Sequence, residues 1–459
     1  MNKLKKLFAP VDMTAGRPWE DILIFTIPML IGNIAQQLYN TVDSIVVGRF
    51  VGDNALAAVG SAGPILNLLI VLFVGISVGA SIMVSQYLGA RNREALSGTI
   101  GTCIMLTAIA SLIIMVVATL AARPLLELLN TPDSILDWCT SYLRILFLGA
   151  AGLAYYNILS GVLRGLGDSM SALLYLLVAS ALNIVLDLLF VVKFGMGVNG
   201  VALATAIAQG ISAVLCVRRL SKLTELFDLK WKYIRLNKQH ARNIIRLGVP
   251  SGVTQAMISM AMLIVQSLTN SFGEQFIAAN VITMRVDGFA MLPNMSFGNA
   301  MTTYAGQNVG ANQYERVFKG AKQGLFMGVG TSVVITSLIL IFGKPLMGIF
   351  TSTSELVDLS YHLMQILAVG YLVMSVTQVL SGVMRGAGDT MTPMWISIVQ
   401  TIMIRVPLAY LLVYASRSTA FPQGKREYIF LSLVISWVIG ALITTFFYKR
   451  GKWKTKAIK

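Results

Sequence analysis

The residues best suited to chemistry are two polar side chains inside an apolar stretch. Residues 173–192 are apolar almost throughout and are long enough to cross a bilayer as a helix. Asn183 and Asp187 lie near the middle of this stretch, and their spacing places both on one helix face. A charged side chain at the bilayer centre costs about 3 kcal/mol unless it faces a partner or a watery cavity. The pair therefore predicts an ion or proton site.

A second carboxylate could complete such a site. In the first apolar stretch, residues 21–47, Gln36, Asn40 and Asp43 follow one another at helical spacing, so a polar stripe on one face ends in Asp43. Two carboxylates close together in a medium of low dielectric constant cannot both stay ionised at low cost, so one takes a proton or binds a cation. Asp43 and Asp187 together indicate coupling to an ion gradient.

The composition indicates an all-α polytopic membrane protein. Of the 459 residues, 56% are hydrophobic and 12% are charged, which is about half the charged fraction of a soluble domain. The mean hydropathy is +0.73. Apolar stretches long enough to cross a bilayer as helices alternate with short polar loops, and we expect twelve such spans.

The net charge of +16 is explained by topology rather than by nucleic-acid binding. With the N-terminus inside, most of the 36 Lys and Arg fall in inside loops and tails, which is the distribution that sets membrane orientation. We therefore expect a protein of the cytoplasmic (inner) membrane with both termini in the cytoplasm. The three cysteines and two histidines show no metal-binding spacing, and no cofactor is expected.

The second half of the chain repeats the first. Residues 164–168, Arg-Gly-Leu-Gly-Asp, recur 221 positions later at 385–389 as Arg-Gly-Ala-Gly-Asp, and residues 86–90 recur at 307–311 with the same offset. One offset shared by separate loops indicates a duplication. Because each copy has six spans, both enter the membrane from the same side. We expect two parallel six-helix lobes related by a pseudo-two-fold axis along the membrane normal.

Five segments follow from this organisation. They are a cytoplasmic tail (1–20), a first lobe (21–217), a basic linker (218–243), a second lobe (244–448) and a basic cytoplasmic tail (449–459). The basic stretch around the linker, residues 218–246, carries nine Lys or Arg together with Trp231 and Tyr233. It fits a segment that lies against anionic headgroups and fits a solvated connector equally well.

The two copies differ where the buried polar side chains lie. Shifting Asn183 and Asp187 by 221 positions leads to Ile404 and Leu408, which are both apolar. A side chain needed for the folding of a lobe would be expected in both copies. The difference therefore favours a functional site in the first lobe over a structural polar contact.

The second lobe has a charged pair of its own, Asp287 and Arg405, in spans 8 and 11. Because buried charges are usually paired, we expect a structural ion pair, and the alternative is a second site for substrate or proton. Asp168 and Asp389 end the repeated loops beside glycines, a pattern typical of turns and helix caps.

A substrate cavity is expected between the two lobes. Its predicted lining combines polar and aromatic side chains with methionines, whose flexible thioethers suit a surface that accepts many apolar shapes. The residues are Gln36, Tyr39, Asn40, Tyr156, Met257, Met260 and Met291. For any single methionine, ordinary packing in the core or against lipid is an equally good explanation.

At these residues the chain resembles the multidrug and toxic compound extrusion (MATE) family. The resemblance covers all twelve spans and rests on the loops LRGLGD and MRGAGD, the two Gln-x-x-Gly-Ala loops, the Ile-Pro start of span 1 and the segment YNTVDSIVVGRFVG. It implies a secondary antiporter with two six-helix bundles that rock about a central cavity and export cationic or amphiphilic compounds. Within the family the chain is similar to archaeal and DinF-like members, which place their cation site in the first lobe.

The resemblance also implies the residues of that cation site. They are Asp43, Asn157, Asn183, Asp187 and Thr205. Their oxygen atoms suit Na⁺, and the same carboxylates could carry protons, so both H⁺ and Na⁺ remain open as coupling ions. Members of the NorM-like branch also use acidic residues in spans 7 and 10, which this chain lacks. We therefore expect the coupling site in the first lobe and no other metal site.

Other classes of protein fit less well. An enzyme is not expected, because no catalytic motif appears and the loops are too short to hold a soluble active site. A channel or a purely structural membrane protein would not need carboxylates in one lobe only. A major-facilitator transporter would normally carry Asp-Arg-x-Gly-Arg where this chain has Gly-Ala-Arg-Asn-Arg at residues 89–93. A flippase for a lipid-linked saccharide is the closer alternative. We expect a monomer in the bilayer, and the sequence does not name its substrate.

Overall fold

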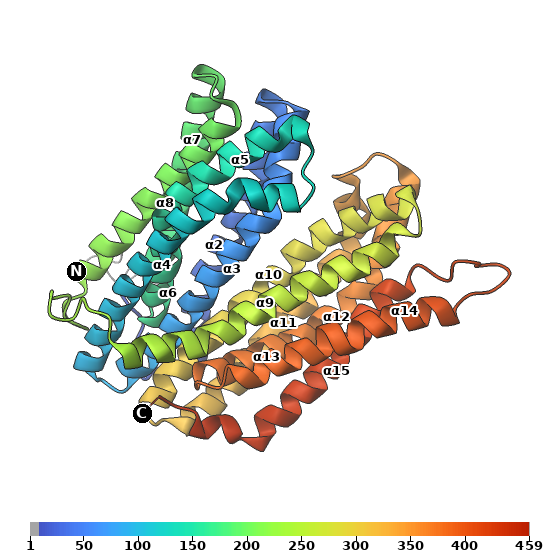
Figure 1. Ribbon diagram of the computed structural model, residues 1–459. Coiled ribbons are helices and arrows are strands. Elements are labelled where there is room, and N and C mark those ends of the chain that lie inside the picture. Colours follow the sequence, from blue (N-terminus) through green and yellow to red (C-terminus); the bar gives the residue numbers. More distant parts are fainter. Residues whose placement is uncertain (1–8, 459) are drawn as a thin grey trace. The chain divides into compact units, whose positions relative to one another are not determined.

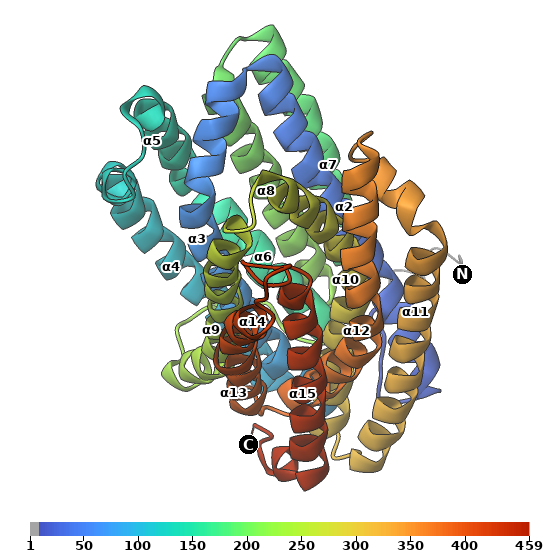
Figure 2. The same cartoon turned by 90° about the vertical axis from the view of Figure 1, so that its right-hand side faces the viewer.

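The computed structural model describes residues 9–458, and the side chains at positions 40, 43–45, 53 and 56 lie outside the described part. Within that part the chain folds into long helices without strands, as both views show (Figure 1 and Figure 2). Among residues 9–458, eleven helices are long and apolar enough to cross a membrane, and a bent pair of shorter helices supplies a twelfth span. The expected all-α architecture with twelve spans is confirmed.

The first six spans are apolar enough that a bilayer leaves their backbone groups no partners except those within each helix. The fourth span is the bent pair, which turns by 52° at Gly149. The fifth changes from α-helix to π-helix near its end. The elements are α2 (Pro18–Phe50), α3 (Asp53–Gly89), α4 (Arg93–Leu128), α5 (Asp133–Leu148), α6 (Ala150–Gly165), α7 (Ser169–Asp187), η1 (Leu188–Lys193) and α8 (Gly197–Lys222).

The last six spans repeat this order, and their fifth member again contains a π-helical segment. The elements are α9 (Lys238–Asn270), α10 (Glu274–Gly310), α11 (Tyr314–Gly348), α12 (Ser354–Gly386), α13 (Met391–Ile398), η2 (Val399–Arg405), α14 (Val406–Ala415), α15 (Tyr428–Arg450) and the short 3₁₀-helix η3 (Lys452–Thr455). Their core is a cluster of apolar side chains that includes Tyr371, Phe430 and Trp437.

The backbone preserves the duplication at the repeated turns. Gly167 and Gly388 both have positive φ, at 85° and 95°, and so do Arg91 and Asn312, at 52° and 57°. Each pair is separated by 221 positions, the offset seen in the sequence. Left-handed backbone is uncommon for non-glycine residues, so its recurrence at Arg91 and Asn312 reflects one turn built twice.

In each copy, two neighbouring helices pack closely because a glycine on one of them faces the other. A Cβ atom on Gly161 of α6 would collide with Ser77 of α3, and one on Gly382 of α12 would collide with the carbonyl of Gly298 on α10. Gly382 lies 221 positions after Gly161, and Gly298 lies 221 positions after Ser77. Small residues that let backbones approach are a common means of helix association in membranes.

The contacts divide the chain into two compact units at points other than the expected boundaries. One unit comprises Met1–Asp12 and Ile27–Gly252, and the other comprises Met13–Thr26 and Val253–Lys459. The first turns of α2 therefore belong with the second half of the chain, and the first turns of α9 with the first half. Pro28 and Pro250 lie at these two changes of unit, and a proline inside a helix removes a backbone hydrogen bond there.

Arg316 explains why the start of α2 belongs to the second unit. Its guanidinium donates from Nε to the carbonyl of Met13 at 3.0 Å and from Nη1 to that of Gly16 at 2.9 Å, and Nη2 also donates to the carbonyl of Ala15. The same group pairs with Asp21 at 2.9 Å. This Arg316 anchor satisfies the carbonyls of an irregular segment and holds the first turn of α2.

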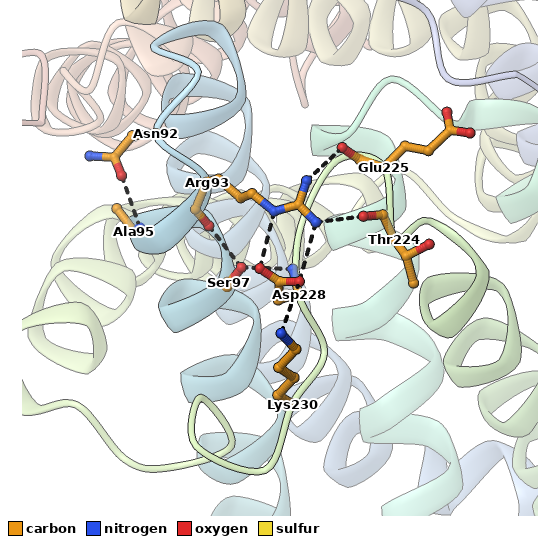
Figure 3. A network of polar contacts seen from close by, with 8 residues as sticks. All are labelled: Asn92, Arg93, Ala95, Ser97, Thr224, Glu225, Asp228 and Lys230. Atoms are coloured by element: carbon orange, nitrogen blue, oxygen red, sulfur yellow. Dashed lines mark hydrogen bonds and ion pairs between the residues drawn. The ribbon is translucent and has the colours of Figure 1, made fainter.

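A second arginine anchor, at a position that is not related to Arg316 by the duplication, holds the connector between α8 and α9 in the first unit (Figure 3). Arg93 donates to the carbonyls of Thr224 and Glu225 at 2.6 and 2.9 Å, and its Nε pairs with Asp228 at 3.1 Å. The hydrogen bond from Arg93 lowers the pKa of Asp228 below its usual value. The pair is therefore charged at neutral pH.

The basic linker is shorter than the expected 218–243. Residues 218–222 extend α8 and residues 238–243 begin α9, so the irregular connector covers residues 223–237. Within it Trp231 is 88% exposed, whereas the carbonyl of Tyr233 packs on Gly101 of α4. The connector is thus a folded part of the first unit, and of its three aromatic residues Phe227 is buried whereas Trp231 is exposed.

The repeated aspartates have the expected capping role. Asp168 accepts a hydrogen bond from the backbone N–H of Ser171 at 3.0 Å at the start of α7, and it also pairs with Arg219 at 2.7 Å. Asp389 accepts from the backbone N–H of Thr392 at 3.2 Å at the start of α13. Both carboxylates satisfy amide groups that a helix start leaves without partners.

Candidate functional site

The first unit contains a buried polar cluster formed by spans 5 and 6. Asn183 and Asp187 of α7 are 1% and 0% exposed, and Thr205 of α8 faces them. The orientation of the Asn183 carboxamide that matches donors to acceptors places its Nδ2 2.9 Å from Asp187 Oδ2, so the amide donates to the carboxylate. Its oxygen then accepts from Thr205 Oγ1 at 3.2 Å and from the Thr205 backbone N–H at 3.1 Å.

Asp187 lies where the helix changes its hydrogen-bond pattern. It is the last residue of α7, and η1 begins at the next residue. A π-helical turn widens the helix and shifts its side chains relative to those of an α-helix, and such turns are frequent at functional sites. The sequence carried no sign of this segment, because the apolar run of residues 188–193 is equally compatible with an α-helix.

Asn157 and Asp43, the other predicted cation-site residues, have no described contact with this cluster. Asn157 of α6 donates from Nδ2 to the carbonyl of Leu153 at 2.8 Å, one turn back on its own helix. No hydrogen bond between described side chains joins it to the cluster. Asp43 falls within α2, but its side chain lies outside the described part, as does that of Asn40. The structure therefore brings together Asn183, Asp187 and Thr205.

The donor set of this cluster suits a proton or a hard monovalent cation. It provides a carboxylate, a carboxamide oxygen and a hydroxyl from Asp187, Asn183 and Thr205, and oxygen is the ligand atom that hard cations prefer. Among the described residues no three side chains of His, Cys, Asp or Glu come together as a metal site. Any cation bound here would thus rely on neutral oxygens as well as on Asp187.

The predicted substrate-cavity residues are divided between the two units, and most of them are partly buried within their own unit. Gln36 and Tyr39 on α2 are half-buried, and Tyr156 on α6 is buried. In the second unit Met257 on α9 is half-buried, Met260 on the same helix is 48% exposed, and Met291 on α10 packs partly against the apolar core.

The second unit has a polar network that the sequence did not reveal. Tyr371 Oη on α12 donates to Asp287 Oδ1 on α10 at 2.8 Å. Asn294 Nδ2 on α10 donates to the backbone carbonyl of Tyr371 at 3.1 Å, and Ser332 Oγ on α11 donates to Asn294 Oδ1 at 2.9 Å. A signal was available in Tyr371, because a phenol within a buried span must find a polar partner.

The expected ion pair between Asp287 and Arg405 is not a direct contact. Among the described residues Asp287 forms no salt bridge with Arg405, although the two side chains are close enough to interact electrostatically. Arg405 is the last residue of η2, and its buried Nε has no hydrogen-bond partner in the described part of the chain. The hydrogen bond from Tyr371 takes the place of the expected salt bridge.

Comparison with known proteins identifies the family. Two stretches of equal length, residues 28–189 and 250–411, each match the MatE family model, one in each copy of the duplication. Together they cover more than half of the chain. The chain belongs to the MatE family.

Curated members of the MatE family match over most of this chain. The probable multidrug resistance protein YoeA of Bacillus subtilis is 29% identical over 406 residues, 87% of this chain and 88% of the relative. YpnP, another probable multidrug resistance protein of the same bacterium, is 28% identical and covers 96% of this chain and 97% of the relative. The multidrug export protein MepA of Staphylococcus aureus is 22% identical, with 84% and 86% covered.

Solved structures confirm the MATE fold. A multidrug resistance MATE family transporter of the MOP superfamily, in an outward-facing conformation, gives a TM-score of 0.89 at 24% identity and covers 96% of this chain and 97% of its own. A MOP superfamily transporter from Pyrococcus furiosus, for which a reversed polarity of the binding pocket is described, gives a TM-score of 0.87 at 24% identity with the same coverage. The protein is thus a multi-pass membrane transporter by family, and it has the MATE fold.

Proposed function

We propose that the protein is a secondary active antiporter that exports cationic or amphiphilic small molecules, among them drugs, in exchange for H⁺ or Na⁺. The names of its relatives support the substrate class, since several are described as multidrug resistance or export proteins. The observation that carries the coupling step is the buried cluster of Asn183, Asp187 and Thr205, in which the carboxylate of Asp187 accepts a hydrogen bond from the Asn183 carboxamide.

The cluster supports ion coupling because it occurs in one copy of the duplication only. The positions 221 residues after Asn183 and Asp187 are the apolar Ile404 and Leu408. Burying a carboxylate inside a membrane span costs free energy. Because only one lobe carries this carboxylate, the folding of a lobe does not require it, and a function such as ion coupling explains why it is kept. In our proposal Asp43 adds a second carboxylate from α2, and the pair exchanges a proton or Na⁺ for a cationic substrate.

The proposed cycle follows from charge. A cation that enters the cluster neutralises Asp187, weakens the hold on a cationic substrate and permits the two lobes to rock to the other orientation. Each positive charge that moves inward down a membrane potential supplies about 2.3 kcal/mol per 100 mV. That energy would sustain a substantial outward gradient of substrate. The proposal includes a monomer in the cytoplasmic membrane with both termini in the cytoplasm, and no cofactor.

The test is transport by the purified protein in liposomes with imposed gradients. Efflux of a fluorescent organic cation should depend on a pH gradient or on a sodium gradient, and the gradient that drives it identifies the coupling ion. Asp187→Asn should keep the fold, because a carboxamide oxygen still accepts from Asn183, but transport should no longer respond to that gradient.

Asp389→Asn is the matched control, since it alters a buried carboxylate that caps α13 and lies outside the cluster. This variant should retain the gradient dependence of the wild-type protein. Wild-type transport with unchanged gradient dependence in Asp187→Asn would refute the assignment of the cluster. Movement of a lipid-linked saccharide without export of organic cations would favour the flippase instead.

A further inference from the structure

A pocket of about 560 Å³ lies in the second unit, and its lining includes no residue of either polar cluster. It is formed by the first turn of α2 and the first four turns of α11, and both segments belong to that unit. Its lining is half basic and polar and half aromatic and apolar. The residues are Trp19, Lys319, Lys322, Gln323, Phe326 and Met327.

The pocket carries positive charge that the protein itself does not neutralise. Among the described residues neither Lys319 nor Lys322 has an ion-pair or hydrogen-bond partner. The two acidic side chains that follow Trp19 are already engaged, since Glu20 pairs with Arg17 and Asp21 pairs with Arg316. Two like charges one helical turn apart repel each other. An anion between them would remove that repulsion.

The pocket also offers an unmatched acceptor and an apolar floor. The side-chain oxygen of Gln323 is buried and has no hydrogen-bond partner in the described part of the chain. One turn further into α11 lie Phe326, which is 82% exposed, and Met327. A fitting ligand is therefore negative at one end, donates a hydrogen bond beside that charge, and is apolar at its other end.

The depth of the pocket suits the boundary between headgroups and acyl chains. α11 has 35 residues, which corresponds to about 50 Å of helix and exceeds the hydrocarbon core of roughly 30 Å. Its first turns must then extend into the headgroup region. Trp19 contributes an indole, the side chain that is enriched at this level of the membrane. Lys319 and Lys322 lie nearer the start of α11 than Phe326. This order matches a bound lipid, whose charged headgroup lies at the membrane surface and whose acyl chains lie deeper.

The duplication provides an internal comparison. The positions 221 residues before Lys319 and Lys322 are Gly98 and Gly101 of α4. His240 of α9 covers Gly98, and the connector covers Gly101. A Cβ atom on Gly101 would collide with the backbone carbonyl of Tyr233. In the first copy another part of the chain covers this surface, and the glycines of α4 leave room for it. In the second copy the surface is open and carries two lysines.

The N-terminal tail is a poor candidate to cover the open surface. Residues 1–8 carry three lysines and no acidic side chain, so they would add positive charge to a site that already has an excess. Anionic lipids, in contrast, are drawn to basic residues at the membrane surface. Charge complementarity thus favours a lipid over this segment of the chain.

We propose that this pocket binds one anionic glycerophospholipid whose headgroup carries a hydroxyl, as in phosphatidylglycerol. Lys319 and Lys322 hold the phosphate, Gln323 accepts a hydrogen bond from the headgroup hydroxyl, and Phe326 and Met327 contact the first methylenes of an acyl chain. The site shares no residue with the proposed coupling cluster and does not depend on the transported ion.

Native mass spectrometry of the full-length protein tests the proposal. Lipid retained after exchange into phosphatidylglycerol is compared with that retained in phosphatidylcholine, which bears the same phosphate but no net charge. Because each lysine near a membrane surface adds about 1 kcal/mol of attraction, the double variant Lys319→Gln/Lys322→Gln should lose on the order of thirtyfold in its preference for phosphatidylglycerol. Inorganic phosphate added in excess should not displace the lipid.

The matched control is Lys449→Gln/Lys452→Gln, which removes two exposed lysines of the same unit, also three positions apart, that do not line the pocket. This control should keep the wild-type preference. An equal loss in both double variants, or an unchanged preference in the first, would refute the site. Displacement by inorganic phosphate would assign the pocket to a free anion.

A second variant tests the headgroup contact. Phosphatidylmethanol carries the same charge as phosphatidylglycerol but lacks its hydroxyl groups. The wild-type protein should therefore retain more phosphatidylglycerol, and Gln323→Leu should retain the two lipids equally. If the ratio of the two lipids is the same in the variant and the wild-type protein, the role assigned to Gln323 is wrong.

Discussion

Hydrogen bonds decide how single charges are tolerated within these spans. In the first unit a carboxamide donates to Asp187, and in the second unit a phenol donates to Asp287. Asp287 forms no direct salt bridge with a cation among the described residues. A carboxylate bound by neutral donors can change its proton or its counter-ion without stranding a buried cation, whereas one locked in a buried salt bridge cannot.

Tyr371 is expected to contribute to stability through this bond. Tyr371→Phe removes the donor to Asp287 Oδ1 and leaves a buried acceptor without it, so the free energy of unfolding should fall by about 1–3 kcal/mol. Thermal unfolding of the purified variant measures the change. Tyr414→Phe, which alters an exposed tyrosine of α14, is the control and should unfold like the wild-type protein. A Tyr371→Phe variant as stable as the control would contradict this role.

The sequence predicted the polar residues better than their contacts. Asn183, Asp187 and Thr205 were found because polar groups inside apolar spans are conspicuous, and spacing along one helix fixes which of them share a face. The contact between Tyr371 and Asp287 joins α10 to α12, and no spacing within one span can encode it. Asp287 and Arg405 interact electrostatically without a salt bridge between them in the described part of the chain, and complementary charge in the sequence does not specify which of the two contacts forms.

At the scale of the helices, features set by the local sequence were predicted, whereas features set by tertiary packing were not. Twelve spans and two repeated loops could be predicted, because length, apolar content and offset are properties of the chain itself. The break of 52° between α5 and α6 was not predicted, although Gly149 lies there. The π-helical segments η1 and η2 were also missed, because their residues have ordinary apolar patterns and packing selects the wider turn.

The connector between α8 and α9 is expected to resist proteolysis as long as Arg93 holds it. Arg93→Ala removes the donor to two carbonyls and the partner of Asp228, so trypsin should cut at Lys230, Lys232 or Arg235 several times faster than in the wild-type protein. The cleavage rate of the folded protein measures this effect. Arg242→Ala, which removes an exposed arginine of α9, should leave the rate unchanged.

The same contact has a defined pH dependence. Because the hydrogen bond from Arg93 lowers the pKa of Asp228, the contact is fully present above the ordinary pKa of a carboxyl group and is lost only as the pH falls through the lowered value. Protection of the connector should therefore persist throughout the neutral range. If protection disappeared near neutral pH, another group would have to control the contact.

At the scale of the whole molecule, orientation can be tested with the protein's own cysteines in place. Cys103, Cys139 and Cys216 are buried, so they give little background with a thiol reagent that cannot cross membranes. In intact cells a cysteine at Thr419, in the exposed loop after α14, should be labelled from outside. A cysteine at Lys230 should react only after the membrane is opened. The opposite pattern would reverse the orientation proposed from the charge distribution.

The exchange of helix starts between the two units has a consequence for biosynthesis. The segment that enters α2 is among the first parts of the chain to be made, yet the Arg316 anchor that binds it at Gly16 follows 300 residues later. At roughly 5–20 residues per second, a ribosome takes about 15–60 s to supply that partner. During this interval the nascent segment lacks its native partner. It therefore depends on the insertion machinery or on chaperones to avoid contacts with other parts of the chain or with other proteins. Translation thus sets the earliest time at which the second unit can be complete.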